Sequence, residues 1–221
     1  MSPGTIGVAA PDVLKRILLG PVHSASVLEK GVGLRSEVEV ELIRKCRTGD
    51  ARFFEPLVRA YEGPGLRVAT GMLGDVDDAR DALQEAFVKV FRNLSKFDTR
   101  RAFGPWFFQI LRNQCRDMIR SRNSRATREA RDERLELRAA DPELGPERAR
   151  ERAAARSLLW RGLERVGDDH REILVLKELQ GFKYPEIAEI LGIPEGTVAS
   201  RLYHARRALR DALEELGIRY P

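Results

Sequence analysis

The side chains best suited to binding chemistry lie near the C-terminus, in a segment rich in arginine. Between Thr197 and Arg210 the sequence has no acidic residue. Apolar residues recur there at three- and four-residue steps, the period of a helix that buries one face. These are Val198, Leu202, Ala205 and Leu209. The opposite face carries Ser200, Tyr203, His204, Arg207 and Arg210, with Arg201 and Arg206 at its flanks. Such a helix suits the DNA major groove, where side chains meet base edges and phosphates.

A second helical pattern precedes this segment, and a turn separates the two. Gly192 supplies a positive-φ stop and Pro194 cannot continue the first helix, so the sequence predicts a helix-turn-helix. The alternative is a solvated amphipathic helix of an ordinary bundle. A helix of that kind normally mixes both charge signs on its exposed face, and this one does not before Asp211.

A second cationic stripe is predicted on a helix over residues 105–121. Its apolar arc comprises Phe107, Leu111, Cys115, Met118 and Ile119. The neighbouring arc carries Gln109, Arg112, Asn113, Arg116 and Arg120, with Trp106 at its edge. The preceding loop adds Lys96, Arg100 and Arg101. Arginines follow phosphates, and an aromatic ring stacks on an unpaired base at about 1–3 kcal/mol, which favours single-stranded or melted nucleic acid. The alternative for Trp106 is a simple core position.

Acidic residues gather at the start of a third predicted helix, over residues 77–93. They are Asp75, Asp77, Asp78, Asp81 and Glu85. Stabilisation of the helix N-terminus accounts for most of them. A docking surface for a basic protein face remains open as an alternative.

The helical period appears in two blocks. The first holds segments 37–46, 51–61, 77–93 and 105–121, and the second segment is expected to stop at Gly63-Pro64-Gly65. The apolar period resumes at residue 156, after a stretch dominated by charged residues. We therefore predict an all-α chain with a flexible extension (1–36), a helical domain (37–125), a charged linker (126–155) and a second helical domain (156–221).

Composition narrows the range of functions. The chain has 221 residues, a formal net charge of +5 and two cysteines, Cys46 and Cys115, with no Cys/His set at metal-ligand spacing. No apolar run is long enough to span a membrane, and the N-terminus lacks the order of a secretory signal, which favours the cytoplasm. We find no nucleophile–base set and no phosphate-binding glycine loop, so neither an enzyme nor a bound cofactor is expected.

Three motifs resemble one known family, the extracytoplasmic-function sigma factors of bacterial RNA polymerase. They are DDARDALQEAFVKVF at residues 77–91, PWFFQILRNQCRDMI at 105–119, and PEIAEIL at 185–191 followed by TVASRLYHAR at 197–206. The resemblance covers about residues 37–125 and 155–215, in the order of the family's regions two and four.

The resemblance implies partners and roles. Core RNA polymerase would be contacted by Asp78, Gln84, Glu85 and Phe91. The loop 95–103 would hold a base flipped from the minus-ten element, and the opened strand would lie along the following helix; the residues implied are Lys96, Asp98, Arg100, Arg101, Trp106, Arg112, Asn113, Arg116 and Arg120. The minus-35 element would be contacted by Thr197, Ser200, Arg201, Tyr203, His204, Arg206 and Arg207. An anti-sigma factor is a further expected partner, as family members commonly have one.

The sequence also departs from the family. Lys183 stands where a serine usually caps the first helix of the turn, which removes an N-cap of about 1 kcal/mol. Ala199 and His204 replace residues that are often basic. Two rival functions remain: a helix-turn-helix regulator that does not engage polymerase, and an enzyme such as a recombinase or nuclease carrying this motif.

Overall fold

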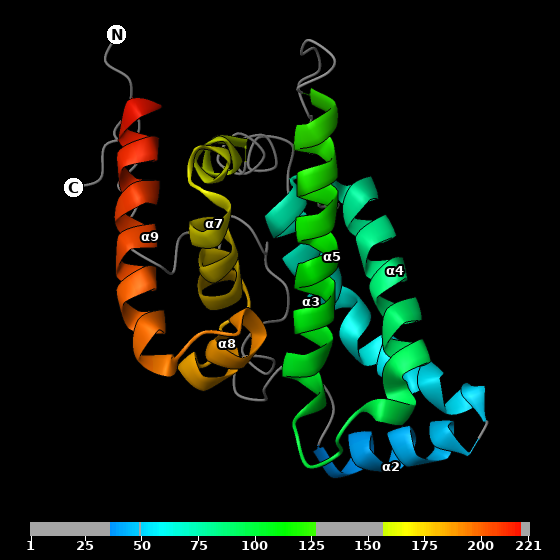
Figure 1. Cartoon of the computed structure of the whole chain (residues 1–221). Helices are drawn as coiled ribbons and strands as arrows, with labels where there is room; N and C mark the ends of the chain where they lie inside the picture. The colour runs from blue at the N-terminus through cyan, green and yellow to red at the C-terminus, as the bar shows by residue number, and fades with distance from the viewer. Residues whose placement is uncertain (1–35, 49, 127–156, 218–221) are drawn as a thin grey trace, which may run out of the picture.

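The computed structural model describes residues 36–48, 50–126 and 157–217, and every regular element within these ranges is a helix (Figure 1). The predicted all-α class is confirmed. Except for Ser36 and Ala126, the predicted extension and linker lie outside the described residues. We call residues 36–126 the N-terminal unit and residues 157–217 the C-terminal unit.

The N-terminal unit is built on three long helices. Its elements are α2 (Ser36–Arg47), the 3₁₀ turn η1 (Ala51–Phe54), α3 (Glu55–Leu73), α4 (Val76–Asn93), the 3₁₀ turn η2 (Leu94–Lys96) and α5 (Phe103–Ala126). Gly74 ends α3 at φ 79°, and Asp75 then caps α4. The Asp75 carboxylate accepts hydrogen bonds from the backbone N–H groups of Asp77 and Asp78, at 2.9 and 2.8 Å. The first acid of the cluster therefore has a structural role.

The break predicted at Gly63-Pro64-Gly65 is wrong, because α3 runs through all three residues. The reason is tertiary packing. Gly65 is buried, and a Cβ atom there would lie 2.6 Å from Leu83 Cδ1 of α4 and 3.3 Å from the Phe107 ring of α5. Glycine thus lets three helices approach closely, and this packing compensates for the hydrogen bond that Pro64 cannot donate.

An aromatic cluster forms the centre of the N-terminal unit. The Tyr61 ring of α3 lies 5.2 Å from Phe103, 5.1 Å from Phe107 and 6.1 Å from Phe108, all in α5. The Tyr61 hydroxyl donates to the carboxylate of Glu39 in α2. Burial raises the pKa of Tyr61, so its hydroxyl stays protonated and remains a donor. The cluster thereby fixes α2, α3 and α5 against one another.

The C-terminal unit contains the predicted helix-turn-helix. A helix over residues 157–165 precedes α7 (Asp168–Leu174), the π-helical turn η3 (Val175–Leu179), α8 (Tyr184–Leu191) and α9 (Glu195–Glu215). Gly192 ends α8 at φ 67°, as predicted. The apolar stripe of α9 is buried as predicted: Val198, Leu202, Ala205 and Leu209. Lys183 makes no side-chain cap, but its backbone N–H donates to Glu186 Oε2 at 2.7 Å.

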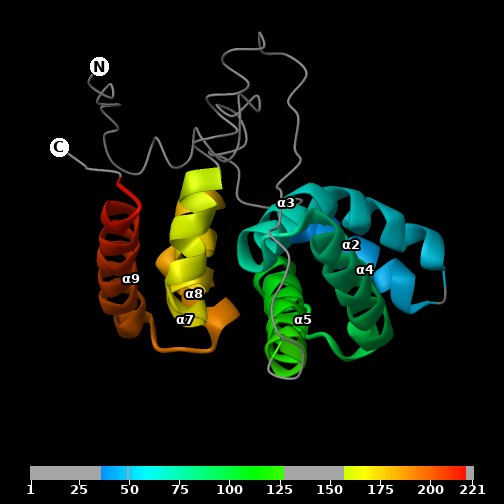
Figure 2. The ribbon, with the colours of Figure 1, turned by 90° about the horizontal axis from the view of Figure 1, so that it is seen from above.

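The two units lie side by side (Figures 1 and 2). Helix α5 packs beside α8, and α3 packs beside α7 and η3. The rings of Phe108 in α5 and Phe182 before α8 are 4.9 Å apart. Apolar contacts therefore continue from one unit into the other. None of the described helices has both the length and the apolar character that a membrane crossing requires.

The two thiols are expected to differ in reactivity. Burial raises the pKa of Cys115 to about 12, so this group carries almost no thiolate at pH 8. Cys46 is only partly buried, and its pKa is raised by that burial and by the charge of Asp50. Titration with a thiol reagent at pH 8 should detect one slowly reacting group in the folded protein and two in denaturant. Two fast groups in the folded protein would contradict the burial of Cys115.

Candidate nucleic-acid interface

The outer face of α9 presents most of the residues predicted to contact a DNA duplex. Ser200, Tyr203, His204 and Arg207 are all exposed, and Tyr203 has 64% of its surface accessible. Thr197 is half-buried at the start of the helix. The rings of Tyr203 and His204 lie 5.4 Å apart, so together they form an aromatic surface. This face combines hydroxyl, imidazole and guanidinium groups, which hydrogen-bond to bases and phosphates.

Two of the predicted α9 arginines are engaged within the protein. Arg206 donates to Glu178 Oε1 through Nε at 2.9 Å and through Nη2 at 2.6 Å. Arg201 Nη1 lies 3.9 Å from Glu172 Oε1. Among the described residues Arg207 and Arg210 have no ion-pair partner, which leaves them as the available cations of this face.

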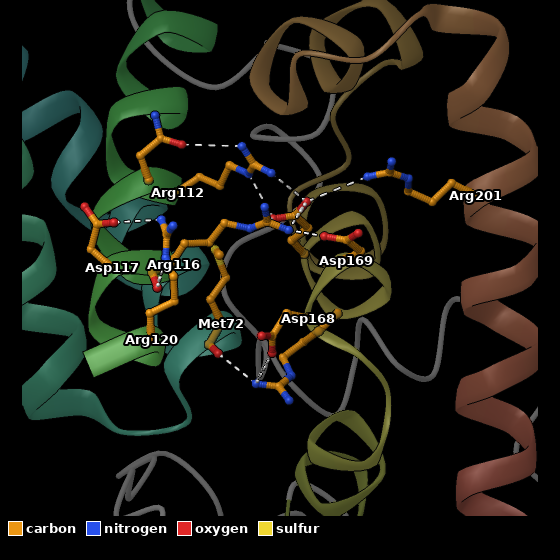
Figure 3. A network of polar contacts seen from close by, with 11 residues as sticks. Met72, Arg112, Arg116, Asp117, Arg120, Asp168, Asp169 and Arg201 are labelled. Atoms are coloured by element: carbon orange, nitrogen blue, oxygen red, sulfur yellow. Dashed lines mark hydrogen bonds and ion pairs between the residues drawn. The ribbon is translucent and has the colours of Figure 1, made fainter. Parts of the chain in front are cut away.

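The α5 stripe faces the C-terminal unit in this arrangement. Arg112 binds the carboxylate of Glu172 in two places, with Nε to Oε2 at 2.9 Å and Nη2 to Oε1 at 3.0 Å. Arg116 Nε lies 3.0 Å from the same Oε2, and its Nη2 also contacts Asp169. Figure 3 shows both arginines reaching from α5 toward α7. The residues of the predicted strand-binding stripe therefore lie together on α5. Two of them, Arg112 and Arg116, are paired with carboxylates of the C-terminal unit.

The outer part of the stripe remains accessible. Asn113 is exposed, and Arg120 is exposed but paired with Asp117 at 2.8 Å. Trp106 is half-buried, with its ring 4.5 Å from that of Phe97 and 5.7 Å from that of Phe103. Trp106 thus packs against the loop and keeps a partly open surface, and its stacking on a base stays a prediction.

The basic loop before α5 is held by its own charges. Arg100 donates to the Asp98 carboxylate at 2.7–3.0 Å, and this hydrogen bonding lowers the pKa of Asp98 to about 2. Arg101 reaches the other unit, with Nη2 2.6 Å from Glu189 Oε1 in α8. Lys96 is exposed.

The predicted polymerase-contact residues all lie on α4, but they face two different sides of it. Gln84 and Glu85 are exposed, whereas Asp78 contacts Arg122 of α5. Phe91 is exposed, with 45% of its surface accessible. It lies at the rim of a groove of about 680 Å³ between η1, α3 and α4, which Gln84 also lines.

The sequence analysis missed two features: the acidic partners of Arg112 and Arg116, and the wall of the groove that lies opposite α4. Glu172 has only 1% of its surface exposed, in a run of buried residues that continues to Leu176. Glu172 directly precedes the apolar residues Ile173–Leu176, and an acid beside such a run was the available signal for a buried ion pair. The groove wall of Phe54, Val58 and Leu66 comes from η1 and α3. No spacing within one helix reveals it.

Two family descriptions match the chain: Sigma-70 region 2 over residues 57–125 and Sigma-70, region 4 over residues 156–209. The RNA polymerase sigma-H factor of Pseudomonas aeruginosa is 31% identical over 188 residues, covering 83% of this chain and 97% of that protein. SigW of Bacillus subtilis, an ECF RNA polymerase sigma factor, is 32% identical over 180 residues, covering 79% and 96%. The ECF sigma-E factor of Escherichia coli is 31% identical over 180 residues, covering 79% and 94%.

Two solved structures have a similar fold. The structure of CnrH in complex with the cytosolic domain of CnrY superposes with a TM-score of 0.57 and 26% identity, covering 80% of this chain and 98% of that one. The structure of the sigma factor RpoE with the anti-sigma factor NepR from Bartonella quintana gives a TM-score of 0.55 and 24% identity, covering 68% and 91%. The second likeness supports the fold alone.

Adjacent arginines of α9 are expected to behave differently. Arg207→Ala removes an unpaired surface cation, so it should weaken duplex binding and reduce the slope of log K against log salt by about one. Arg206→Ala instead leaves the mostly buried Glu178 unpaired and should lower the free energy of unfolding by about 1 kcal/mol. Fluorescence anisotropy in a salt series and thermal melts measure the two effects. The assignment fails if Arg207→Ala leaves the slope unchanged.

Proposed function

The chain belongs to the extracytoplasmic-function sigma factors of bacterial RNA polymerase, and on this premise we propose how its surfaces share the work of promoter recognition. It is a promoter-specificity factor: it binds core polymerase, recognises the minus-35 and minus-ten elements, and promotes promoter opening. Two cationic helices, α5 and α9, lie within the segments that match regions two and four, and this observation supports the roles proposed for the two surfaces.

Region four, for which we propose residues 156–221, contacts the minus-35 duplex through α9. Ser200, Tyr203 and His204 meet base edges, and Arg207 contacts phosphate. Their exposure on one face supports this role. Arg206 serves the fold through Glu178 rather than the DNA. We propose that region two adds to the affinity, because linked sites on one DNA molecule bind together more tightly than either does alone.

Region two, for which we propose residues 37–125, captures the minus-ten strand. The loop 95–103 receives a flipped base, and Trp106 offers a stacking surface beside it. Phe97 packs against the indole, with ring centroids 4.5 Å apart, while the Asp98–Arg100 pair holds the shape of the loop. Arg112 and Arg116 follow the phosphates once the C-terminal unit moves away from them.

The polymerase surface of region two is proposed to be the α4 side with its groove. Gln84 and Glu85 provide exposed polar contacts, and Phe91 provides an apolar contact at the rim. An exposed aromatic beside an apolar groove is typical of a protein-docking surface. Asp78 is proposed as a contact as well, although Arg122 holds it in this arrangement.

The factor acts through binding energy, and we propose that the bond-forming chemistry belongs to the polymerase. We propose an anti-sigma factor as a further partner, because members of the family commonly have one. We propose that the protein works in the cytoplasm, where promoter DNA and polymerase are found.

Transcription in vitro tests this function directly. The purified chain and core polymerase should start transcripts from a subset of a genomic promoter pool, whereas core polymerase alone should start none of them. A helix-turn-helix regulator would bind DNA but would neither retain core polymerase in a pull-down nor start transcripts. Absence of both activities would therefore overturn the assignment.

Removal of the indole should separate promoter opening from polymerase binding. Trp106→Ala takes away a stacking surface worth about 1–3 kcal/mol for one base, so the open-complex yield in a permanganate footprint should fall while polymerase retention stays unchanged. Trp106→Phe is the matched control, because it keeps a ring against Phe97 and should retain part of the opening. Equal open-complex yields for Trp106→Ala and the unmodified protein would refute this role.

A further inference from the structure

The turn that opens the loop 95–103 is held by one arginine from a distant part of the chain. Arg47, the last residue of α2, donates through Nε to the carbonyl oxygen of Leu94 at 3.0 Å. Its Nη2 donates to the carbonyl oxygen of Phe97. Leu94 is the first residue of η2, and Phe97 directly follows that turn. One guanidinium group therefore binds the backbone on both sides of η2.

These carbonyl groups lie where the backbone leaves helical geometry. Phe97 is extended, with φ −68° and ψ 128°, and its N–H donates to the carbonyl of Leu94 at 3.3 Å. Carbonyl groups at the end of a helical turn have no partner further along the same turn, so they need donors from elsewhere. A charged donor makes a stronger hydrogen bond than a neutral one. Arg47 thus fixes the point at which the chain enters the loop.

The position of Arg47 is itself set by the core of the N-terminal unit. Ile43, one turn earlier on α2, is fully buried, and Glu39 accepts the hydrogen bond from the Tyr61 hydroxyl. Helix α2 also packs beside η1 and η2. Figure 1 shows α2 lying across the end of the unit where α4 finishes and α5 begins. The loop is therefore braced by an element that is anchored independently of it.

The brace continues from the loop backbone to the indole. The ring of Phe97 is buried and lies 4.5 Å from the ring of Trp106 and 5.8 Å from that of Phe103. Phe97 is thus held by its carbonyl on the α2 side and by its ring on the α5 side. Any shift of its backbone would move the surface against which Trp106 packs.

We propose that Arg47 is a positioning residue of the minus-ten site: it fixes Phe97 so that Trp106 presents its ring to the unpaired base, and it does not itself touch DNA. The identity of the ligand rests on the proposed function, whereas the support of the indole by α2 does not. The opposing interpretation is that Arg47, which is exposed, contacts a phosphate directly.

Fluorescence of Trp106 tests the support without DNA. The chain has two tryptophans, so Trp160→Phe leaves Trp106 as the only indole. In this background of the full chain, Arg47→Ala should raise the Stern–Volmer constant for acrylamide quenching, because the loop beside the indole loosens. Arg44→Ala is the matched control, since its ion-pair partner Glu41 lies on the same helix, and it should leave the constant unchanged. An unchanged constant for Arg47→Ala would overturn the support.

A double-mutant cycle tests whether Arg47 acts through Trp106. The measured quantity is the affinity of the chain with core polymerase for a fluorescent single-stranded oligonucleotide. This oligonucleotide carries the minus-ten region of a promoter found in the transcription experiment. Arg47→Ala should weaken binding on the order of tenfold, because a misplaced indole loses a stacking contact of that size. In the Trp106→Ala background the same change should weaken binding less than about twofold, since that contact is already absent.

The outcomes separate the two interpretations. If Arg47 contacts phosphate, Arg47→Ala would weaken binding equally with and without Trp106, and would reduce the slope of log K against log salt by about 0.7. Either result would overturn the positioning role, and so would a looser indole with unchanged strand affinity. If no promoter is found at all, the proposed function fails and the DNA role of Arg47 fails with it. The quenching experiment would still decide whether α2 supports the indole.

Discussion

The carboxylate of Glu172 is buried away from water and therefore requires positively charged neighbours. The arginines that supply this charge come from more than one helix and connect the two units. Arg112 belongs to α5 and Arg201 to α9, so a single acid connects these two helices. Exposed pairs such as Arg101–Glu189 contribute roughly 0–1 kcal/mol each. Removal of one partner from a buried pair costs more, about 3–5 kcal/mol, whereas separation into water costs far less. The arrangement is therefore specific without being permanent.

Close backbone approach is the second constraint. Gly65 lets α3 meet α4 and α5 within the N-terminal unit, and Gly71 lets α3 meet η3 of the other unit. One helix therefore serves both the internal core and the contact between units. The rings around Tyr61 then fix α5, the helix that carries the strand-binding stripe. Substitutions near Gly65 are expected to affect the fold of a unit, while those near Gly71 affect how the units associate.

The sequence predicts those structural features that depend on the local spacing of apolar residues. The buried stripe of α9 and the glycine stop at Gly192 needed only the spacing of apolar residues and the conformational freedom of one residue type. The stripe on α5 follows the same logic, with Phe107 and Leu111 buried on the adjoining arc. Features that depend on contacts between distant segments could not be predicted from local spacing. The continuity of α3 through Pro64, the groove beside Phe91 and the carboxylates facing Arg112 all arise from contacts between elements far apart in the chain.

On α9, the residues that pack against the rest of the fold are separate from those proposed to contact DNA. Leu202 and Ala205 hold α9 in the core and Arg206 pairs with Glu178, whereas Tyr203 and His204 are exposed, with their rings 5.4 Å apart. Exchanges at such solvent-facing positions usually alter stability by no more than about 0.5 kcal/mol. If α9 reads the minus-35 element as proposed, duplicated copies of a gene for this protein can diverge in regulon by altering a few outward side chains, while inheriting an intact scaffold.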